Sequence, residues 1–296
     1  MNSASAEETQ ENIRQQGQWY GYWGWNRSQY SSSNIDFKGD DHDFTLHNAD
    51  AQDRQNDVTA SSIFNRYLSP VNLTIPQYNY RFGYFVADDW SVSLGFDHMK
   101  YVLEENQIVG LSGTIDTPGF EKTNPIQEDK QFSSDFMSFE HTDGLNMISL
   151  ETEYFYSLWN HGKDYDFALF AGAGAGLMIP KTNVKMLNYD RNDEFHLAGY
   201  ATSIKGGFEF TFFHNWFLRG MAKFGYTNMD DVLTTSDGEK ASQTFYFDEY
   251  IGAIGYRFCI PNRIHYLNIP LTSVEVSCLL CPSSRHSSSC KWPIEF

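Results

Sequence analysis

Two acid–histidine pairs are the sequence's best candidates for hydrolytic chemistry. A serine-type hydrolase needs a hydroxyl, a histidine and an acid in contact. Asp97 precedes His98, and Glu194 lies near His196. Successive residues of a strand point to opposite faces, so Asp97 would not orient His98. The segment HLAGYATS (196–203) has a histidine and a serine, but not in a tight His-x-Ser spacing. We therefore expect no catalytic residues.

Metal ligands are a second possibility, in two parts of the chain. One acidic segment carries Asp36, Asp40, Asp41, Asp43, Asp50, Asp53 and Asp57, and carboxylates suit Ca²⁺ or Mg²⁺. Its spacing does not fit the EF-hand loop, and a solvated acidic loop is the simpler interpretation. All four cysteines come after Phe258: Cys259, Cys278, Cys281 and Cys290. Only one tight pair exists there, whereas zinc sites usually use two. We expect no metal and no cofactor.

Ten charged residues form the most regular pattern in the chain. They are Arg81, Asp97, Glu151, Glu153, Lys205, Glu209, Arg219, Lys223, Glu249 and Arg257, five acids and five bases. Each lies in a segment where alternate residues are apolar, aromatic or small. Charges buried in a narrow interior must pair, because burying one alone is very costly. The balance predicts a structural charge network that lines the lumen of a closed barrel.

The elements that would position these charges are eight segments with a period of two, which is typical of strands. They are Gln18–Arg27, Gln77–Val86, Trp90–Val102, Leu145–Trp159, Asp166–Ile179, Leu197–Phe213, Trp216–Tyr226 and Thr244–Phe258. Most reach the roughly 9–11 residues that a tilted strand needs to cross a bilayer. Their other face carries rings, which gather near the short connections as an interfacial aromatic girdle would.

The connections alternate in length along the chain. Short turns at 87–89, 160–165 and 214–215 separate long connections at about 28–76, 103–144, 180–196 and 227–243. Sorting of loops by length onto two ends is typical of a transmembrane barrel. The predicted fold is all-β: a closed 8-stranded antiparallel up-and-down transmembrane β-barrel with long loops on one side. The segments IDFKG and DFTLHNAD also suggest a hairpin above the membrane.

Composition excludes some classes and permits this one. No apolar run reaches the roughly 18–20 residues of a membrane helix. A mean hydropathy of -0.48 still fits alternating strands, which average to a polar value. The net charge of -17, without a basic stripe, argues against a nucleic-acid partner. The start, MNSASAEETQENIRQQ, lacks the apolar core of a signal peptide, and we expect a mature or engineered N-terminus.

The chain resembles the small bacterial outer-membrane β-barrel family, which includes the OmpA-type domain, and more narrowly the barrels of Bacteroidetes. The resemblance rests on QWYGYWGWNRSQY near the start, on IPQYNYRFGYFVADDWSVSLGFDHMKYV (75–102), and on IGAIGYRF, which ends at Phe258. It implies an outer-membrane location, contact with membrane lipid and lipopolysaccharide, and recognition of the terminal aromatic residue by the barrel-assembly machinery. We expect a monomer with a structural or surface-interaction role and at most narrow small-solute passage.

Three alternatives stay open at this point: a lipid A-modifying enzyme in the same fold, a soluble lipocalin-like carrier, and a true channel. The carrier would turn its apolar face inward. The domain organisation that we expect is a flexible N-terminal segment (1–17), the barrel (18–258) and an atypical tail (259–296). The tail lacks alternation and holds all the cysteines, so we interpret it as a disordered read-through or frame-shifted extension.

Overall fold

The computed structural model describes residues 12–53, 77–120, 125–133, 136–187, 189–190 and 192–260. These residues form one sheet of fifteen antiparallel strands and no helix. No helix in the described ranges is therefore long and apolar enough to cross a membrane. The predicted all-β class is confirmed.

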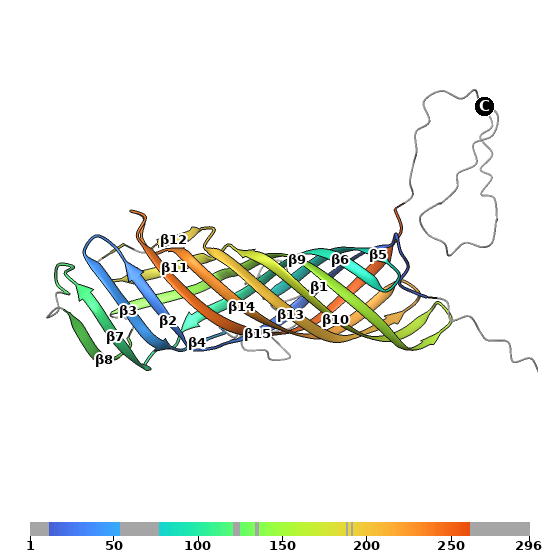
Figure 1. Cartoon of the computed structure of the whole chain (residues 1–296), viewed down its shortest axis with the longest axis horizontal. Coiled ribbons are helices and arrows are strands. Elements are labelled where there is room, and N and C mark those ends of the chain that lie inside the picture. The colour runs from blue at the N-terminus through green and yellow to red at the C-terminus, as the bar shows by residue number, and fades with distance from the viewer. Residues whose placement is uncertain are drawn as a thin grey trace, which may run out of the picture.

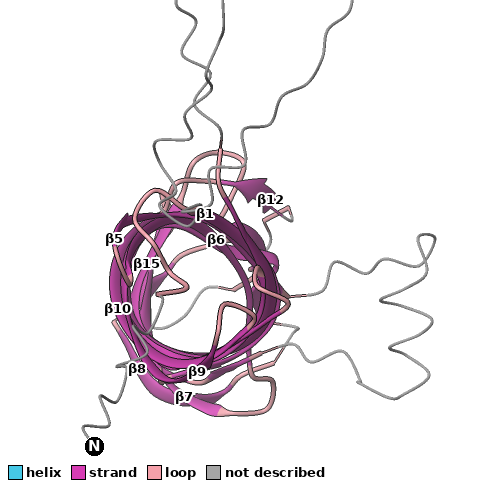
Figure 2. Ribbon diagram, turned by 90° about the vertical axis from the view of Figure 1, so that its right-hand side faces the viewer, coloured by secondary structure: helices cyan, strands magenta, loops and turns pink. Residues whose placement is uncertain are grey.

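Eight strands close into a ring, as Figure 2 shows in the view along the barrel. In spatial order they are β1 (Trp19–Tyr30), β5 (Tyr78–Ala87), β6 (Trp90–Leu103), β9 (Met137–His161), β10 (Tyr165–Met178), β13 (Gly199–Phe212), β14 (Trp216–Leu233) and β15 (Lys240–Phe258). The ring closes because β1 pairs with β15 along its whole length, from Trp19 opposite Phe258 to Tyr30 opposite Phe247. The eight predicted strands are confirmed.

The barrel has a short-turn end and a long-loop end (Figure 1). The connections after β5, β9 and β13 are tight, and residues such as Asp89, Gly162 and His214 adopt positive φ there. At the other end, the long connections fold into further strands: β2 (Ser33–Lys38), β3 (His42–Ala49), β4 (Ala51–Gln52), β7 (Ile108–Ile115), β8 (Ile126–Gln131), β11 (Lys181–Met186) and β12 (Asn192–Phe195). The expected hairpin is present as β2 and β3, and it continues the sheet from β15 to β7 and β8.

Side-chain polarity in the short-turn half is apolar outside and charged inside. On β9, Glu151 and Glu153 point into the barrel and are buried, while Leu150 and Tyr154 point outward and are exposed. The same arrangement holds around the ring, where Leu94 is 59% and Ile204 is 63% exposed. A carrier would have these apolar groups around a central cavity, whereas here they form the outer surface.

The long-loop half has the opposite polarity. The inward face of β9 becomes apolar at Met137 and Phe139, while Ser138 and Glu140 face outward. Met137 and Phe139 belong to a large apolar cluster that also includes Phe37 and Phe44 from the β2–β3 hairpin. A smaller aromatic cluster fills the short-turn end. The ionic residues of the lumen therefore lie among these rings, on the short-turn side of the large apolar cluster.

The ends of the chain bear on the expected domain boundaries. Residues 12–17, which the sequence assigns to a flexible segment, have defined contacts under the barrel: Gly17 N donates to Phe85 O (2.9 Å), and Asp89 N donates to Arg14 O (3.0 Å). Residues 1–11 and 261–296 lie outside the described residues, so the interpretation of the tail stays a prediction.

Candidate functional site

The ten charged residues singled out in the sequence all lie in the lumen and all are buried, with exposures of 6% or less. They come from six of the eight ring strands, and their inward direction follows from strand alternation. Ion pairs connect them into one network, which occupies the middle of the barrel.

The half of the network nearer the long loops is centred on Arg81 and Asp97. The Arg81 guanidinium donates to both Asp97 oxygens (2.8 Å each) and to Glu151 Oε1 (2.6 Å). Lys223 Nζ bridges Asp97 (2.6 Å) and Glu151 (2.9 Å), and lies 3.8 Å from Glu249. A Cβ at Gly95 would collide with the Arg81 guanidinium, so glycine leaves the room that this group needs.

The other half is centred on two glutamates. Glu209 accepts from Arg219 Nε (2.7 Å) and Arg257 Nη1 (2.7 Å). Glu153 accepts from Arg219 Nη1 (3.1 Å) and pairs with Lys205. Lys205 also reaches Glu151 (2.5 Å), which joins the two halves into one continuous network.

Arg14 is a member that the sequence did not reveal. Its side chain is fully buried and enters the lumen from below the short turns, where Nη1 donates to Asp166 (2.6 Å) and Glu209 (3.0 Å). Its Nε donates to Asp89 (3.0 Å) in the β5–β6 turn. Arg14 precedes the first alternating segment, so no periodicity could place it. With Arg14 and Asp166, the described lumen network holds six acids and six bases.

Aromatic rings surround one cation of the short-turn half, Arg219. The Arg219 guanidinium carbon lies 4.8–5.3 Å from the ring centroids of Tyr20, Tyr22, Phe155, Phe170 and Phe217. The negative faces of aromatic rings stabilise a cation at this range. Rings and Arg14 together close the short-turn end of the lumen.

The long-loop end is closed by packed side chains. Tyr101 packs against Phe139 (6.5 Å between centroids), Phe245 (5.1 Å) and His141 (5.5 Å). His141 contacts Thr182 Oγ1 through Nδ1 (3.0 Å) and Gln243 Nε2 through Nε2 (3.3 Å). Burial lowers the pKa of His141 to about 3, so the ring is neutral at pH 7.

The candidate catalytic pairs are not assembled. Asp97 points into the lumen, while His98 stacks on Tyr78 and contacts Asn146 Oδ1 through Nδ1 (2.8 Å). His196 lies 3.2 Å from Asp231, and not beside Glu194. A contact that the sequence did not suggest joins His47 Nε2 to Ser112 Oγ (2.7 Å) across β3 and β7. Within the described residues, no carboxylate hydrogen-bonds to His47, so this pair lacks the third member of a triad.

The aspartates of the first long loop are dispersed over the long-loop end. Asp36 accepts from Thr45 Oγ1 (2.5 Å), and buried Asp53 accepts from Ser28 N (3.1 Å) and from Gln77. Of the six that the structure describes, only Asp41 lies in a group of potential metal ligands, with His42 and Glu239. Asp57 lies outside the described residues.

Comparison with known proteins gives only structural similarities. No protein-family model matches the chain, and no curated protein matches it. Among solved structures it is similar to OprG of Pseudomonas aeruginosa (11% identity, 84% of this chain and 100% of that one, TM-score 0.41). It is also similar to neisserial surface protein A (9% identity, 82% and 97%, TM-score 0.35) and to Ail, the attachment invasion locus protein of Yersinia pestis (12%, 82% and 99%, TM-score 0.32). These values carry no argument about function, which rests on the residues of this chain.

Proposed function

We propose that this chain is an integral outer-membrane protein with a sealed lumen and a structural or surface-interaction role, carried by its long-loop end. One observation supports this most directly: the polarity of the barrel reverses between its two halves. Rings and aliphatic groups cover the outside of the short-turn half, and paired ions fill its inside. Mostly polar groups cover the outside of the long-loop half, with a few exposed apolar side chains such as Ile108 and Phe195, and apolar groups fill its inside.

The apolar outer surface has the dimensions of a membrane belt. On β14 it runs from Trp216 to Tyr226, about ten residues, which corresponds to roughly 25 Å for a tilted strand. Aromatic side chains border it at the short turns, with Trp90, Trp159 and Phe213 all exposed. This apolar surface is compatible with the hydrocarbon of a bilayer, and the polar outer surface of the long-loop half is compatible with water. The short turns then face the periplasm, and the long loops face the cell exterior.

The extracellular half is a platform of β-structure. The sheet continues from β15 through β2, β3, β7 and β8, and its inner face packs into the large apolar cluster. An ordered platform of this kind can present a fixed surface to lipopolysaccharide or to another partner outside the cell. The partners that we propose are membrane lipid, lipopolysaccharide and, during insertion, the barrel-assembly machinery, which would recognise Phe258 at the β1–β15 seam. We propose a monomer without enzymatic activity.

The lumen geometry favours a closed barrel over a channel. Its central ions are paired with one another, aromatic rings pack around them, and an apolar cluster closes the long-loop side. A hydrated path would have to separate buried ion pairs, which is costly. We therefore propose little or no passage even of small ions.

Planar-bilayer recording of the folded protein tests this proposal. Folding is checked first by electrophoresis in detergent with and without boiling, where a folded barrel migrates differently from the unfolded chain. We expect no conductance steps above the baseline of the bilayer. Regular steps of one size, which scale with the amount of protein added, would refute the sealed lumen and favour a channel.

A further inference from the structure

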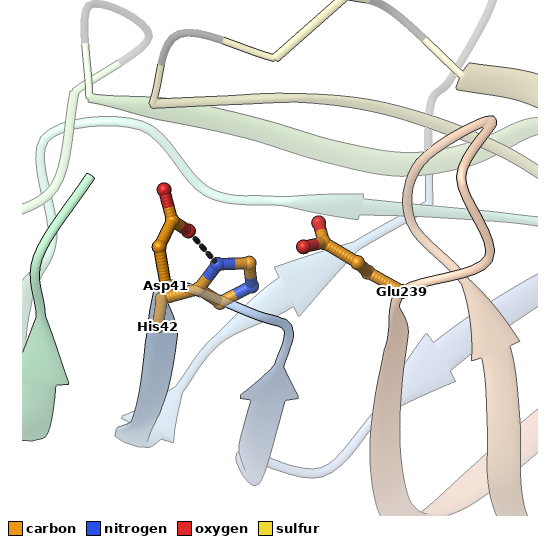
Figure 3. A group of neighbouring side chains, drawn as sticks. All are labelled: Asp41, His42 and Glu239. Carbon is orange, nitrogen blue, oxygen red and sulfur yellow. Dashed lines mark hydrogen bonds and ion pairs between the residues drawn. The ribbon is translucent and has the colours of Figure 1, made fainter. Parts of the chain in front are cut away.

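At the rim of the extracellular platform, the β2–β3 turn meets the β14–β15 loop. Asp41 and His42 come from the turn and Glu239 from the loop, and one potential ligand atom of each lies within 4.8 Å of the other two. Figure 3 shows the imidazole of His42 between the two carboxylates, with Nδ1 on the side of Asp41 and Nε2 on the side of Glu239. The side chain of His42 is completely buried.

The hydrogen bonds of the group leave two buried atoms without a partner. His42 Nδ1 lies 3.0 Å from Asp41 Oδ1, so Nδ1 carries a proton that it donates to this carboxylate. His42 Nε2 is buried and has no hydrogen-bond partner. Glu239 Oε2 is also buried and without a partner.

Charge is unbalanced in the same place. Tyr189 Oη lies 2.6 Å from Asp41 Oδ1 and 3.1 Å from Glu239 Oε1. One hydroxyl has a single proton and can donate it to only one of the two carboxylates at a time. Among the described residues, no lysine or arginine forms an ion pair with Asp41 or Glu239. Two carboxylates thus flank the His42 ring, and neither has a lysine or arginine partner among the described residues.

We propose that this group binds one divalent cation of the zinc class, with His42 Nε2 and the Glu239 carboxylate as ligands. Imidazole nitrogen together with carboxylate oxygen suits Zn²⁺ better than Ca²⁺ or Mg²⁺, which prefer oxygen alone. Asp41 then holds the imidazole from behind, in the carboxylate–histidine–metal arrangement common at zinc sites. Water completes the coordination on the exposed side of the turn.

The position of the site gives the cation a structural effect. The two segments lie beyond the last rungs of the β15–β2 ladder, where Lys240 is opposite Lys38. Glu239 Oε1 already accepts from Asp40 N (3.1 Å), and a Cβ at Gly39 would collide with both His42 and Glu239. A bound cation would fasten the β2–β3 hairpin to the barrel rim and stabilise the platform.

Titration calorimetry with zinc chloride tests the proposal on the full chain in detergent, without an affinity tag. The cysteines are first blocked with iodoacetamide, because Cys278 and Cys281 could bind zinc independently. We expect one equivalent to bind with a dissociation constant on the order of micromolar. We expect binding to be abolished by His42→Gln and Glu239→Gln, and weakened about 10-fold by Asp41→Asn.

The matched control is His196→Gln, which alters another histidine–carboxylate pair at the same end of the barrel. It should leave zinc affinity unchanged, because His196 and Asp231 are both partly exposed. Heat-dependent migration in electrophoresis shows whether each variant is folded. If His42→Gln does not fold, the Glu239→Gln variant alone tests the site. Absence of zinc binding by the wild-type chain would overturn the proposal. So would binding that survives in folded Glu239→Gln, or calcium binding in place of zinc.

Discussion

At the scale of single residues, the lumen network makes each charge depend on its partners. Arg219 is buried, pairs with Glu153 and Glu209, and is surrounded by five rings. Replacing it with an apolar side chain leaves two carboxylates with fewer counter-charges in a place that water does not reach. Such a loss is far more harmful than the loss of an exposed ion pair.

We predict that Arg219→Met lowers the free energy of unfolding by about 3–5 kcal/mol. The measurement is urea-induced unfolding of the detergent-folded barrel. The control is Lys38→Met, which removes an exposed ion pair with Asp43 (3.6 Å) and should change stability by less than about 1 kcal/mol. Equal effects of the two substitutions would mean that the lumen is hydrated and the network is not sealed.

A second residue-scale prediction concerns His141 in the apolar cluster of the long-loop end. Burial lowers its pKa to about 3 from an ordinary value of 6.5. Between these values the unfolded chain binds a proton that the folded chain does not, so the contribution of His141 to stability falls as the pH drops below 6.5. We predict that wild-type stability decreases relative to His141→Gln by about 1.4 kcal/mol for each pH unit in this range.

Denaturation of both proteins at several pH values, from about pH 6.5 down to about pH 4.5, gives this difference. Glutamine is the chosen replacement because it can still contact Thr182 and Gln243 without titrating in this range. Parallel stability curves for the two proteins would show that His141 is hydrated in the folded state, and that the apolar cluster does not close this end of the barrel.

At the scale of elements, the period of two located the eight ring strands but underestimated several of their lengths. The sequence predicted Leu145–Trp159 and Thr244–Phe258, and the structure extends these strands to Met137–His161 and Lys240–Phe258. Alternation continues through the added residues, but the apolar positions move to the opposite face. On β15, Ala241 and Phe245 point inward, whereas Tyr250 and Ile254 point outward. A strand whose apolar face changes gives a weaker period-two signal, so the predicted segments include only part of the inward-apolar stretch.

The residues of the lumen network could be predicted from the sequence only where they lie on regular strands. Alternation placed the ten lumen charges on one face, because each belongs to a ring strand. Arg14 could not be placed, since it precedes the first strand and reaches the lumen through the fold of residues 12–17. The group of His42 and Glu239 also escaped prediction, because it joins two loops that are about 200 residues apart, and no local spacing reports such a contact.

At the scale of the whole molecule, the interior of the barrel has two regions along its axis. Paired ions and aromatic rings together fill the short-turn half, and an apolar core fills the long-loop half. The outer surface is apolar around the first region and polar around the second. The proposed membrane position, with hydrocarbon around the first region and water around the second, accounts for this reversal of polarity along each long strand.

The most direct test measures these surroundings at one position in each half. A spin label is attached at Ile204→Cys or at Thr244→Cys, in a chain whose four cysteines are replaced by serine, folded into phospholipid vesicles. Both side chains point outward and are exposed. We predict that the label at position 204 is more accessible to oxygen than to a water-soluble nickel chelate, and that the label at position 244 shows the reverse. Equal access of the nickel chelate to both positions would contradict a membrane belt around the ionic half of the barrel.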